Sequence, residues 1–179
     1  ITPDSFYDGG RHTGTDAAIA HGTTLLEQGA DILDVGGEST RPGADPVLES
    51  KELHRVIPVV RALADQGAVV SIDTRNAGVM TRAANAGAKL INDVAALTRP
   101  GAMKAAADSG LPVVLVHSDA DPRTMQEAPA YGDVVTEVLA YLERRIAACE
   151  ASGMPRDRLI ADPGIGFAKT PDHNAQLLA

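Results

Sequence analysis

The sequence predicts an α/β fold built on a parallel sheet, and three observations lead to that prediction. Five short apolar segments, rich in Val, Ile and Leu, alternate with longer amphipathic segments. The short segments are almost continuously apolar, as expected of strands that are buried on both faces of a parallel sheet. A glycine follows each of the longer segments, which favours the left-handed residue that ends many helices. Because this βα unit repeats without a break, we expect one domain over residues 1–179.

The expected strands and helices follow one another in order along the chain. We predict strands at 30–35, 68–73, 89–94, 112–117 and 158–163. We predict helices at 15–29, 48–67, 76–87, 99–110 and 131–153, with a further helical pattern from residue 173. Thr15 or Asp16 is expected to cap the first helix, because short polar side chains favour that position. Pro58 lies inside the second helix and predicts a kink or a break there.

Two architectures fit this repeat, an open doubly wound sheet and a (β/α)₈ barrel. A doubly wound nucleotide-binding fold would carry GxGxxG after its first strand, and that motif is absent. The string GIGFAK at 164–169 has a different spacing and follows the last predicted strand. A barrel needs eight strands and roughly 250 residues. If the fold is a barrel, strand 1 and strands 7–8 are missing, which agrees with the loop-like start ITPDSFYDGG and with an end inside a helical pattern.

Composition argues against several classes of protein. The net charge is −8 and no basic stripe interrupts the sequence, so we expect no nucleic-acid partner. The sequence has no long apolar run and no basic, apolar leader, so we expect neither a membrane span nor a signal peptide. Cys149 is the single cysteine and is expected to be a small packed residue of a helix. A chain without an internal disulfide suits a reducing cytoplasm.

Polar residues follow every predicted strand. They are Asp34, Asp73 with Thr74, Asn92 with Asp93, His117 with Ser118, and Asp162. Because the carboxyl ends of parallel strands meet at one rim, we expect these side chains to form one polar site. Carboxylates and an amide can bind the N–H groups of an amino-pyrimidine edge. With one histidine in the set a zinc site is poorly supported, whereas Mg²⁺ held partly by a substrate phosphate stays open.

Two long loops accompany these strand ends. Residues 2–10 and 36–45 are both longer than a usual βα connection. The second loop, GGESTRPGAD, places Thr40 and Arg41 close after Glu38. The guanidinium of Arg41 can hold a phosphate or a carboxylate through two hydrogen bonds. We therefore expect this loop to bind an anion.

These strings resemble the dihydropteroate synthases, a family of pterin-binding barrel enzymes. The matching strings, in the family's order, are TPDSFYDGG, ADILDVGGESTRPGA, SIDT, INDV, TMQ and DPGIGFAKTPDHN. They extend over nearly the whole chain, and GGESTRPGA is the most specific of them. The resemblance implies a (β/α)₈ TIM barrel of the pterin-binding type. It also implies a reaction of folate synthesis, in which 6-hydroxymethyl-7,8-dihydropterin diphosphate and 4-aminobenzoate give 7,8-dihydropteroate and diphosphate.

The resemblance assigns roles to residues at the strand ends. Asp73, Asn92 and Asp162 would hold the pterin ring. Val116, where the family often has Met, and Phe167 would line that pocket. Asp73 would also be catalytic, because its carboxylate would stabilise the positive charge that develops on the pterin methylene.

The resemblance assigns further roles to the two long loops. Thr40, Arg41 and Pro42 would cover 4-aminobenzoate and the diphosphate. Asp4 and Phe6, in the first loop, would close over the site from its other side. Arg41 would be the other catalytic residue and, together with Mg²⁺, would stabilise the departing diphosphate.

Some of the family's segments are absent from this sequence. The metal-binding Asn would precede Ile1, and the Ser-Arg-Lys and Arg-x-His segments would follow Ala179. Ser118 and Asp119 also replace a more usual apolar and small pair. We therefore expect a piece of a longer cytoplasmic enzyme, inactive by itself, whose full-length form is a homodimer. The expected partners are the two small-molecule substrates, with neither nucleic acid nor a membrane among them.

Two other readings fit the same strand ends. A methyltetrahydrofolate-corrinoid methyltransferase would use the same Asp and Asn residues, but it does not need the GGESTRPGA loop. A non-catalytic pterin-binding paralogue would bind the ring without turnover, yet Thr40, Arg41 and Pro42 are all retained here. Turnover by the full-length protein separates these readings.

Overall fold

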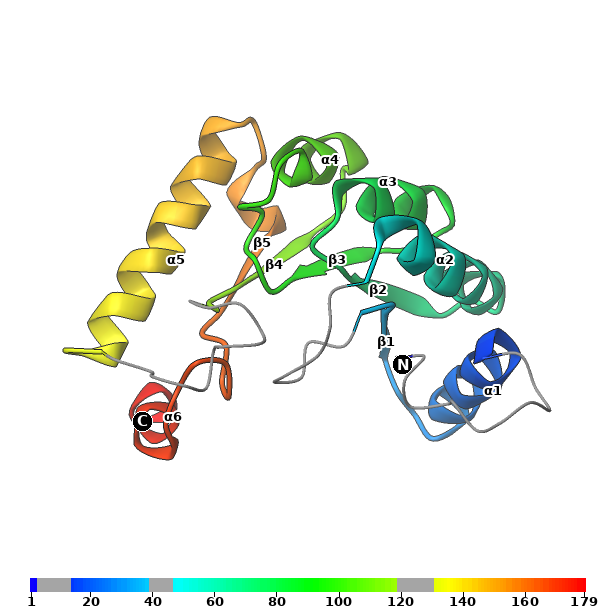
Figure 1. Cartoon of the computed structure of the whole chain (residues 1–179), viewed down its shortest axis with the longest axis horizontal. Helices are drawn as coiled ribbons and strands as arrows, with labels where there is room; N and C mark the ends of the chain where they lie inside the picture. Colours follow the sequence, from blue (N-terminus) through cyan, green and yellow to red (C-terminus); the bar gives the residue numbers. More distant parts are fainter. Residues whose placement is uncertain (3–13, 39–46, 119–130) are drawn as a thin grey trace.

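In the computed structural model, parallel strands alternate with helices along the chain (Figure 1). The structure describes residues 1–2, 14–38, 47–118 and 131–179. The strands are β1 (Ile32–Gly36), β2 (Val69–Asp73), β3 (Leu90–Asp93), β4 (Val113–Val116) and β5 (Leu159–Asp162). The α-helices are α1 (Gly14–Glu27), α2 (Glu49–Asp65), α3 (Ala77–Asn85), α4 (Ala102–Ser109), α5 (Val134–Ala151) and α6 (Pro171–Leu178). A 3₁₀ helix, η2 (Arg156–Arg158), leads into β5.

The five strands form one sheet whose spatial order is the chain order, β1-β2-β3-β4-β5. Helices α2, α3 and α4 lie along the same side of this sheet (Figure 1). A doubly wound sheet would reverse its strand order and carry helices on both faces. The described strands therefore form part of the wall of a (β/α)₈ barrel. Ile1 runs beside the outer edge of β1, where its N donates to Asp34 O at 2.7 Å and its O accepts from Gly36 N at 3.1 Å.

The two faces of the sheet differ in how they are covered. Alternate strand residues pack with the helices into the hydrophobic core, among them Leu33, Val35, Val70, Ile72, Ile91 and Leu115. Several of the residues between them are exposed, with Ile32 at 52%, Val69 at 43% and Ile160 at 48%. We call the face that carries these three residues the open face. Because side chains alternate along a strand, only every second strand residue can reach it.

The predicted elements are confirmed, with small shifts at their ends. Each predicted strand is present, and each of its ends lies within two residues of the prediction. The glycines predicted to follow the helices all have positive φ, and they are Gly29, Gly67, Gly87, Gly110 and Gly153. The predicted caps are wrong, because α1 already includes Gly14 and so neither Thr15 nor Asp16 precedes it. The break predicted at Pro58 is also wrong, because α2 runs through it.

Two expectations from composition can be compared with the described residues. Cys149 is buried in the core, as predicted. Among the helices that the structure describes, none has the length and apolar character needed to cross a membrane.

Candidate functional site

Asp73 and Asn92 lie side by side at the carboxyl-terminal edge of the open face. The parallel register places Asp73, at the end of β2, directly opposite Asn92 of β3. On its other side Asp73 lies opposite Gly36 of β1. A Cβ added at Gly36 would lie 3.3 Å from Asp73 Oδ2, so the carboxylate lies over β1 at this glycine. A side chain at position 36 would therefore press against the Asp73 carboxylate.

The surroundings of Asp73 disfavour its charged form. Burial, followed by the negative charges of Asp34, Asp93 and Glu52, raises the pKa of Asp73 to about 8. The positive charge of Arg75 acts in the opposite direction. Because this pKa lies above neutrality, the carboxyl of Asp73 is mostly protonated at pH 7. A strongly perturbed carboxyl in a polar site is typical of functional positions.

Two buried polar atoms close to Asp73 lack partners among the described residues. They are Oδ1 of Asn92 and the hydroxyl Oγ of Ser71. Ser71 lies two residues before Asp73 on the same face of β2, in register with Asp34 of β1. A buried polar atom without a partner costs about 1–3 kcal/mol, so a ligand that supplies a partner gains affinity from it. The acceptor of Asn92 is therefore suited to a ligand N–H group.

Asp162 and Val116 complete the described part of this site. They lie opposite each other in register, at the ends of β5 and β4. Oδ1 of Asp162 accepts a hydrogen bond from Gly164 N at 2.7 Å, which fixes the orientation of the carboxylate. Val116 is 4% exposed, and Phe167 is half-buried in the turn after β5. The strand ends thus bring the three predicted pterin ligands and Val116 to one edge of the sheet.

A buried lysine fixes the turn after β5. Nζ of Lys169 lies 3.0 Å from His117 Nδ1. It also donates hydrogen bonds to the carbonyl oxygens of Gly164, at 3.1 Å, and Phe167, at 3.0 Å. Gly164 has a φ of 68°, and a Cβ there would collide with the carbonyl oxygen of His117. Glycine is therefore required where this turn crosses the end of β4.

Two strand-end residues do not reach the open face. Asp93 is fully buried, and its carboxylate accepts hydrogen bonds from the backbone N of Ala95 at 2.7 Å and of Leu97 at 2.9 Å. His117 lies on the helix side of the sheet, where its ring packs edge-on against Tyr141 of α5 with centroids 4.8 Å apart. The prediction that every strand delivers polar side chains to one site is therefore wrong at these two positions.

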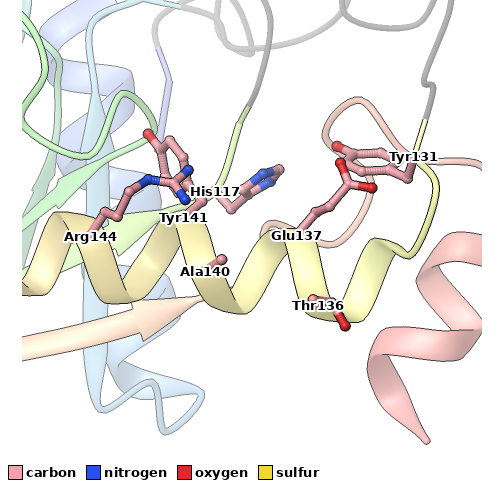
Figure 2. A pocket seen from close by; sticks show the side chains of 7 residues that line it. All are labelled: His117, Tyr131, Thr136, Glu137, Ala140, Tyr141 and Arg144. Atoms are coloured by element: carbon pink, nitrogen blue, oxygen red, sulfur yellow. The ribbon is translucent and has the colours of Figure 1, made fainter.

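His117 borders a separate cavity beside α5. This cavity has a volume of about 230 Å³, and its lining includes His117, Tyr131, Glu137, Tyr141 and Arg144 (Figure 2). Its polar side chains come mainly from α5, on the helix side of the sheet (Figure 2). It is therefore distinct from the cluster around Asp73, which lies on the open face.

One buried acid of this region was missed in the sequence. Glu52 of α2 is 1% exposed, and its Oε2 accepts a hydrogen bond from Asn76 Nδ2 at 2.5 Å. Burial raises the pKa of Glu52. A signal was present, because Glu52 lies one helical turn before the buried Val56 and so falls on the apolar stripe of its helix.

Several predicted site residues lie outside the described residues, so their roles stay predictions. They are Asp4, Phe6, Thr40, Arg41 and Pro42. Within the part of the chain that the structure describes, no group of three or more His, Cys, Asp and Glu side chains could hold a metal ion.

Comparison with known proteins places the chain in a family. The family described as "Pterin binding enzyme" matches residues 1–179, the whole of the sequence. The chain belongs to the pterin binding enzyme family. Its predicted barrel of the pterin-binding type is thereby confirmed.

Individual members of the family resemble the chain closely. It is 50% identical over 180 residues to a dihydropteroate synthase of Escherichia coli strain K12, and the match covers 100% of this chain and 64% of that protein. The structure of a Xanthomonas albilineans dihydropteroate synthase with 4-aminobenzoic acid has a TM-score of 0.92 and 52% identity, and covers 99% of this chain and 63% of its own. A structure of the same enzyme in complex with 7,8-dihydropteroate has a TM-score of 0.88 and 49% identity, with the same coverage. The chain thus spans less than two thirds of the length of these relatives.

Proposed function

We propose that the protein containing this chain is a dihydropteroate synthase and that the chain supplies most of its pterin pocket. The observation that carries the proposal is the placement of Asp73, Asn92 and Asp162 along one edge of the open face. Their carboxylate and amide oxygens are suited to the ring N–H groups of a pterin. The relatives of known structure support the substrates, because they hold 4-aminobenzoic acid and 7,8-dihydropteroate.

The proposed reaction needs charge stabilisation rather than a covalent enzyme intermediate. The bond between the pterin methylene and the diphosphate oxygen breaks, and the electron pair leaves with the diphosphate. The amine of 4-aminobenzoate then forms a bond to the methylene and loses a proton. Asp73, as a carboxylate, stabilises the positive charge on the pterin, and Arg41 stabilises the leaving diphosphate. Thr40, Pro42, Asp4 and Phe6 complete the proposed substrate contacts.

Magnesium assistance is part of this proposal, but the described residues do not form a magnesium site by themselves. They contain no cluster of three potential ligands, and a carboxyl with a pKa of about 8, as at Asp73, is a poor ligand for a hard cation at neutral pH. No step is therefore assigned to the metal through these residues. The Asn that binds Mg²⁺ in this family is expected before Ile1, outside this sequence.

The test is turnover by the protein expressed from its complete reading frame. With 6-hydroxymethyl-7,8-dihydropterin diphosphate and 4-aminobenzoate supplied together, we expect equal amounts of dihydropteroate and diphosphate. Mass spectrometry measures the dihydropteroate, and a phosphate assay after treatment with pyrophosphatase measures the diphosphate. Pterin binding without product would favour the non-catalytic paralogue. Methyl transfer from methyltetrahydrofolate to a corrinoid would favour the methyltransferase.

The remaining parts of the proposal concern assembly and location. We propose a homodimer in the cytoplasm, with small molecules as the other partners and no nucleic acid. The net charge of −8 supports the last point, because nucleic-acid binders normally carry a basic surface. Light scattering of the full-length protein tests the oligomeric state.

A further inference from the structure

The starting point is a second carboxylate on the open face, at Asp34. Asp34 of β1 is exposed and lies in register with Ser71, two residues before Asp73 on the neighbouring strand. Gly36, on the same face of β1, has no side chain to separate the two acids. The Asp73 carboxylate lies over β1 at Gly36, so it lies on the side where Asp34 projects. The two carboxylates therefore share one patch of the sheet.

The charges that face Asp73 come from every element packed around it. Asp34 of β1, Asp93 of β3 and Glu52 of α2 oppose its ionisation, and Asp34 has the largest effect of the three. Arg75, which follows β2, is the cation that favours ionisation. The guanidinium of Arg75 is bound to Glu38 at 2.6 Å, so part of its charge is already neutralised. Of the three acids, Asp34 is the one on the open face, beside the proposed ligand.

Asp34 also differs from the other two acids in that its carboxylate has no partner among the residues that the structure describes. Asp93 is held by two backbone N–H groups, and Glu52 by Asn76. For Asp34 the structure gives only backbone contacts: its carbonyl oxygen accepts from Ile1 N, and β1 pairs with β2. The carboxylate therefore adds negative charge next to Asp73 without holding any described element in place.

We propose that Asp34 is a positioning residue for the proton of Asp73, so that binding of a pterin ring at Asp73 releases that proton to solvent. This proposal rests on the proposed function. Before binding, burial and the charge of Asp34 favour a neutral Asp73, and the neutral state limits the repulsion between the two acids. On binding, the ring N–H donors and the cationic character of the reacting pterin stabilise the Asp73 carboxylate, and its proton leaves as the ligand enters. The negative charge then appears only when a substrate is present to use it.

The proposal predicts a measurable proton count. With a pKa of about 8 for Asp73, a ligand that binds only the carboxylate releases about 0.9 proton at pH 7. Its affinity falls about tenfold for each pH unit below that pKa. Replacing Asp34 by Asn removes the opposing charge that has the largest effect, so the variant releases less proton at pH 7 than the wild type does. The same variant binds the ring about fivefold more tightly at pH 7 and equally well at pH 9. Loss of a merely structural residue would not tighten binding.

The experiment is calorimetry of 6-hydroxymethyl-7,8-dihydropterin binding between pH 5.5 and 9, in pairs of buffers that differ in ionisation enthalpy. It uses the protein from its complete reading frame, and the absorbance of the ligand in the same buffers corrects for its own titration. The matched control is Asp31→Asn, the same change at an exposed position just before β1, which should leave the pH profile as in the wild type. Asp34→Glu keeps the negative charge, so this variant should release as much proton on binding as the wild type does.

Each outcome separates this inference from the proposed function. If the wild type does not bind the pterin, the proposed function fails. If it binds with no proton release, or if Asp34→Asn and the wild type have the same pH profile, the role of Asp34 is overturned while the proposed function stands. If Asp34→Asn weakens binding at every pH, Asp34 is a direct ligand contact and the positioning role is also overturned.

Discussion

Glu38 and Arg75, 37 positions apart in the sequence, form a buried ion pair at the end of the sheet. Glu38 Oε2 accepts hydrogen bonds from Arg75 Nη2 at 2.6 Å and from Arg75 Nε at 3.2 Å. The side chain of Glu38 is 9% exposed and that of Arg75 is 10% exposed. The other carboxylate oxygen, Oε1, accepts from Val47 N at 3.1 Å. One side chain thus joins the end of β1, the segment before α2 and the residue that follows Thr74. The carboxylate that sequence reasoning placed in a binding loop is used to hold the fold together.

Replacing Glu38 by Gln should destabilise the protein by about 3 kcal/mol, because it leaves the Arg75 charge buried without a counter-ion. Urea denaturation measures the change in the free energy of unfolding. The double variant Glu38→Gln with Arg75→Gln should recover part of the loss. The control is Glu150→Gln, which removes an exposed partner of Arg156 at 3.3 Å and should cost less than about 1 kcal/mol. Equal losses in the two single variants would contradict the assignment.

The raised pKa of Asp73 predicts how stability depends on pH. The folded-state pKa, about 8, lies above the ordinary value of 3.8, so the folded state holds this proton more tightly than the unfolded state does. The Asp73 contribution to stability is fully present below the unfolded-state pKa and is lost as pH rises to about 8. Asp73→Asn should remove this dependence and give a protein that is more stable than the wild type at pH 8. Thermal unfolding from pH 4 to 9 tests it, and parallel curves for the two proteins would contradict it.

Asp162→Asn should weaken pterin binding by about tenfold or more, because a charged acceptor for a ligand N–H pair is replaced by an amide. The fold should be retained, since the amide oxygen can still accept the hydrogen bond that Gly164 N donates to Asp162 Oδ1 at 2.7 Å in the wild type. Calorimetry gives the affinity, and Asp157→Asn, an exposed change in η2, serves as the control. Unchanged affinity in the Asp162 variant would refute its assignment to the pterin pocket.

Lys169→Met should destabilise the protein by about 3 kcal/mol, because the carbonyl oxygens of Gly164 and Phe167 lose a buried donor. The turn that carries Phe167 should loosen, and pterin affinity should fall along with the stability. Hydrogen exchange at Phe167 N, which donates to Gly164 O at 3.0 Å, reports on the turn directly. Faster exchange at this amide, with exchange in α2 unaffected at low denaturant, is the expected result. Unaltered exchange at Phe167 would show that the lysine does not hold the turn.

Arg41→Ala tests the proposed diphosphate contact, although this residue lies outside the described residues. Turnover should fall by at least about a hundredfold, because the guanidinium is assigned to charge that develops as the diphosphate leaves. Affinity for the pterin lacking diphosphate should change by less than about threefold. Steady-state kinetics and calorimetry provide the two numbers. Equal losses in both would argue against a role at the diphosphate.

The amino-acid sequence was enough to predict the order of the elements and to propose three residues of the site. Short apolar runs bounded by glycines predicted the five strands, because apolar periodicity and helix ends are local properties of the chain. Their place at strand ends made all the polar residues there candidates, and the family resemblance singled out Asp73, Asn92 and Asp162. The matching strings added the family, which local chemistry could not specify.

Which strand-end residues share a face depends on the packing of the folded chain. Asn92 and Asp93 are neighbours in sequence, yet one lies on the open face and the other is buried against its own backbone loop. A shift of one residue reverses the direction of a strand side chain, and the predicted strand ends differ from the observed ones by up to two residues. Partners far apart in the chain, such as Lys169 and His117 at a separation of 52, are brought together by packing alone. The protonation state of Asp73 also depends on packing. The pKa of Asp73 is raised by burial and by charges from β1, β3 and α2, which come together only in the folded chain.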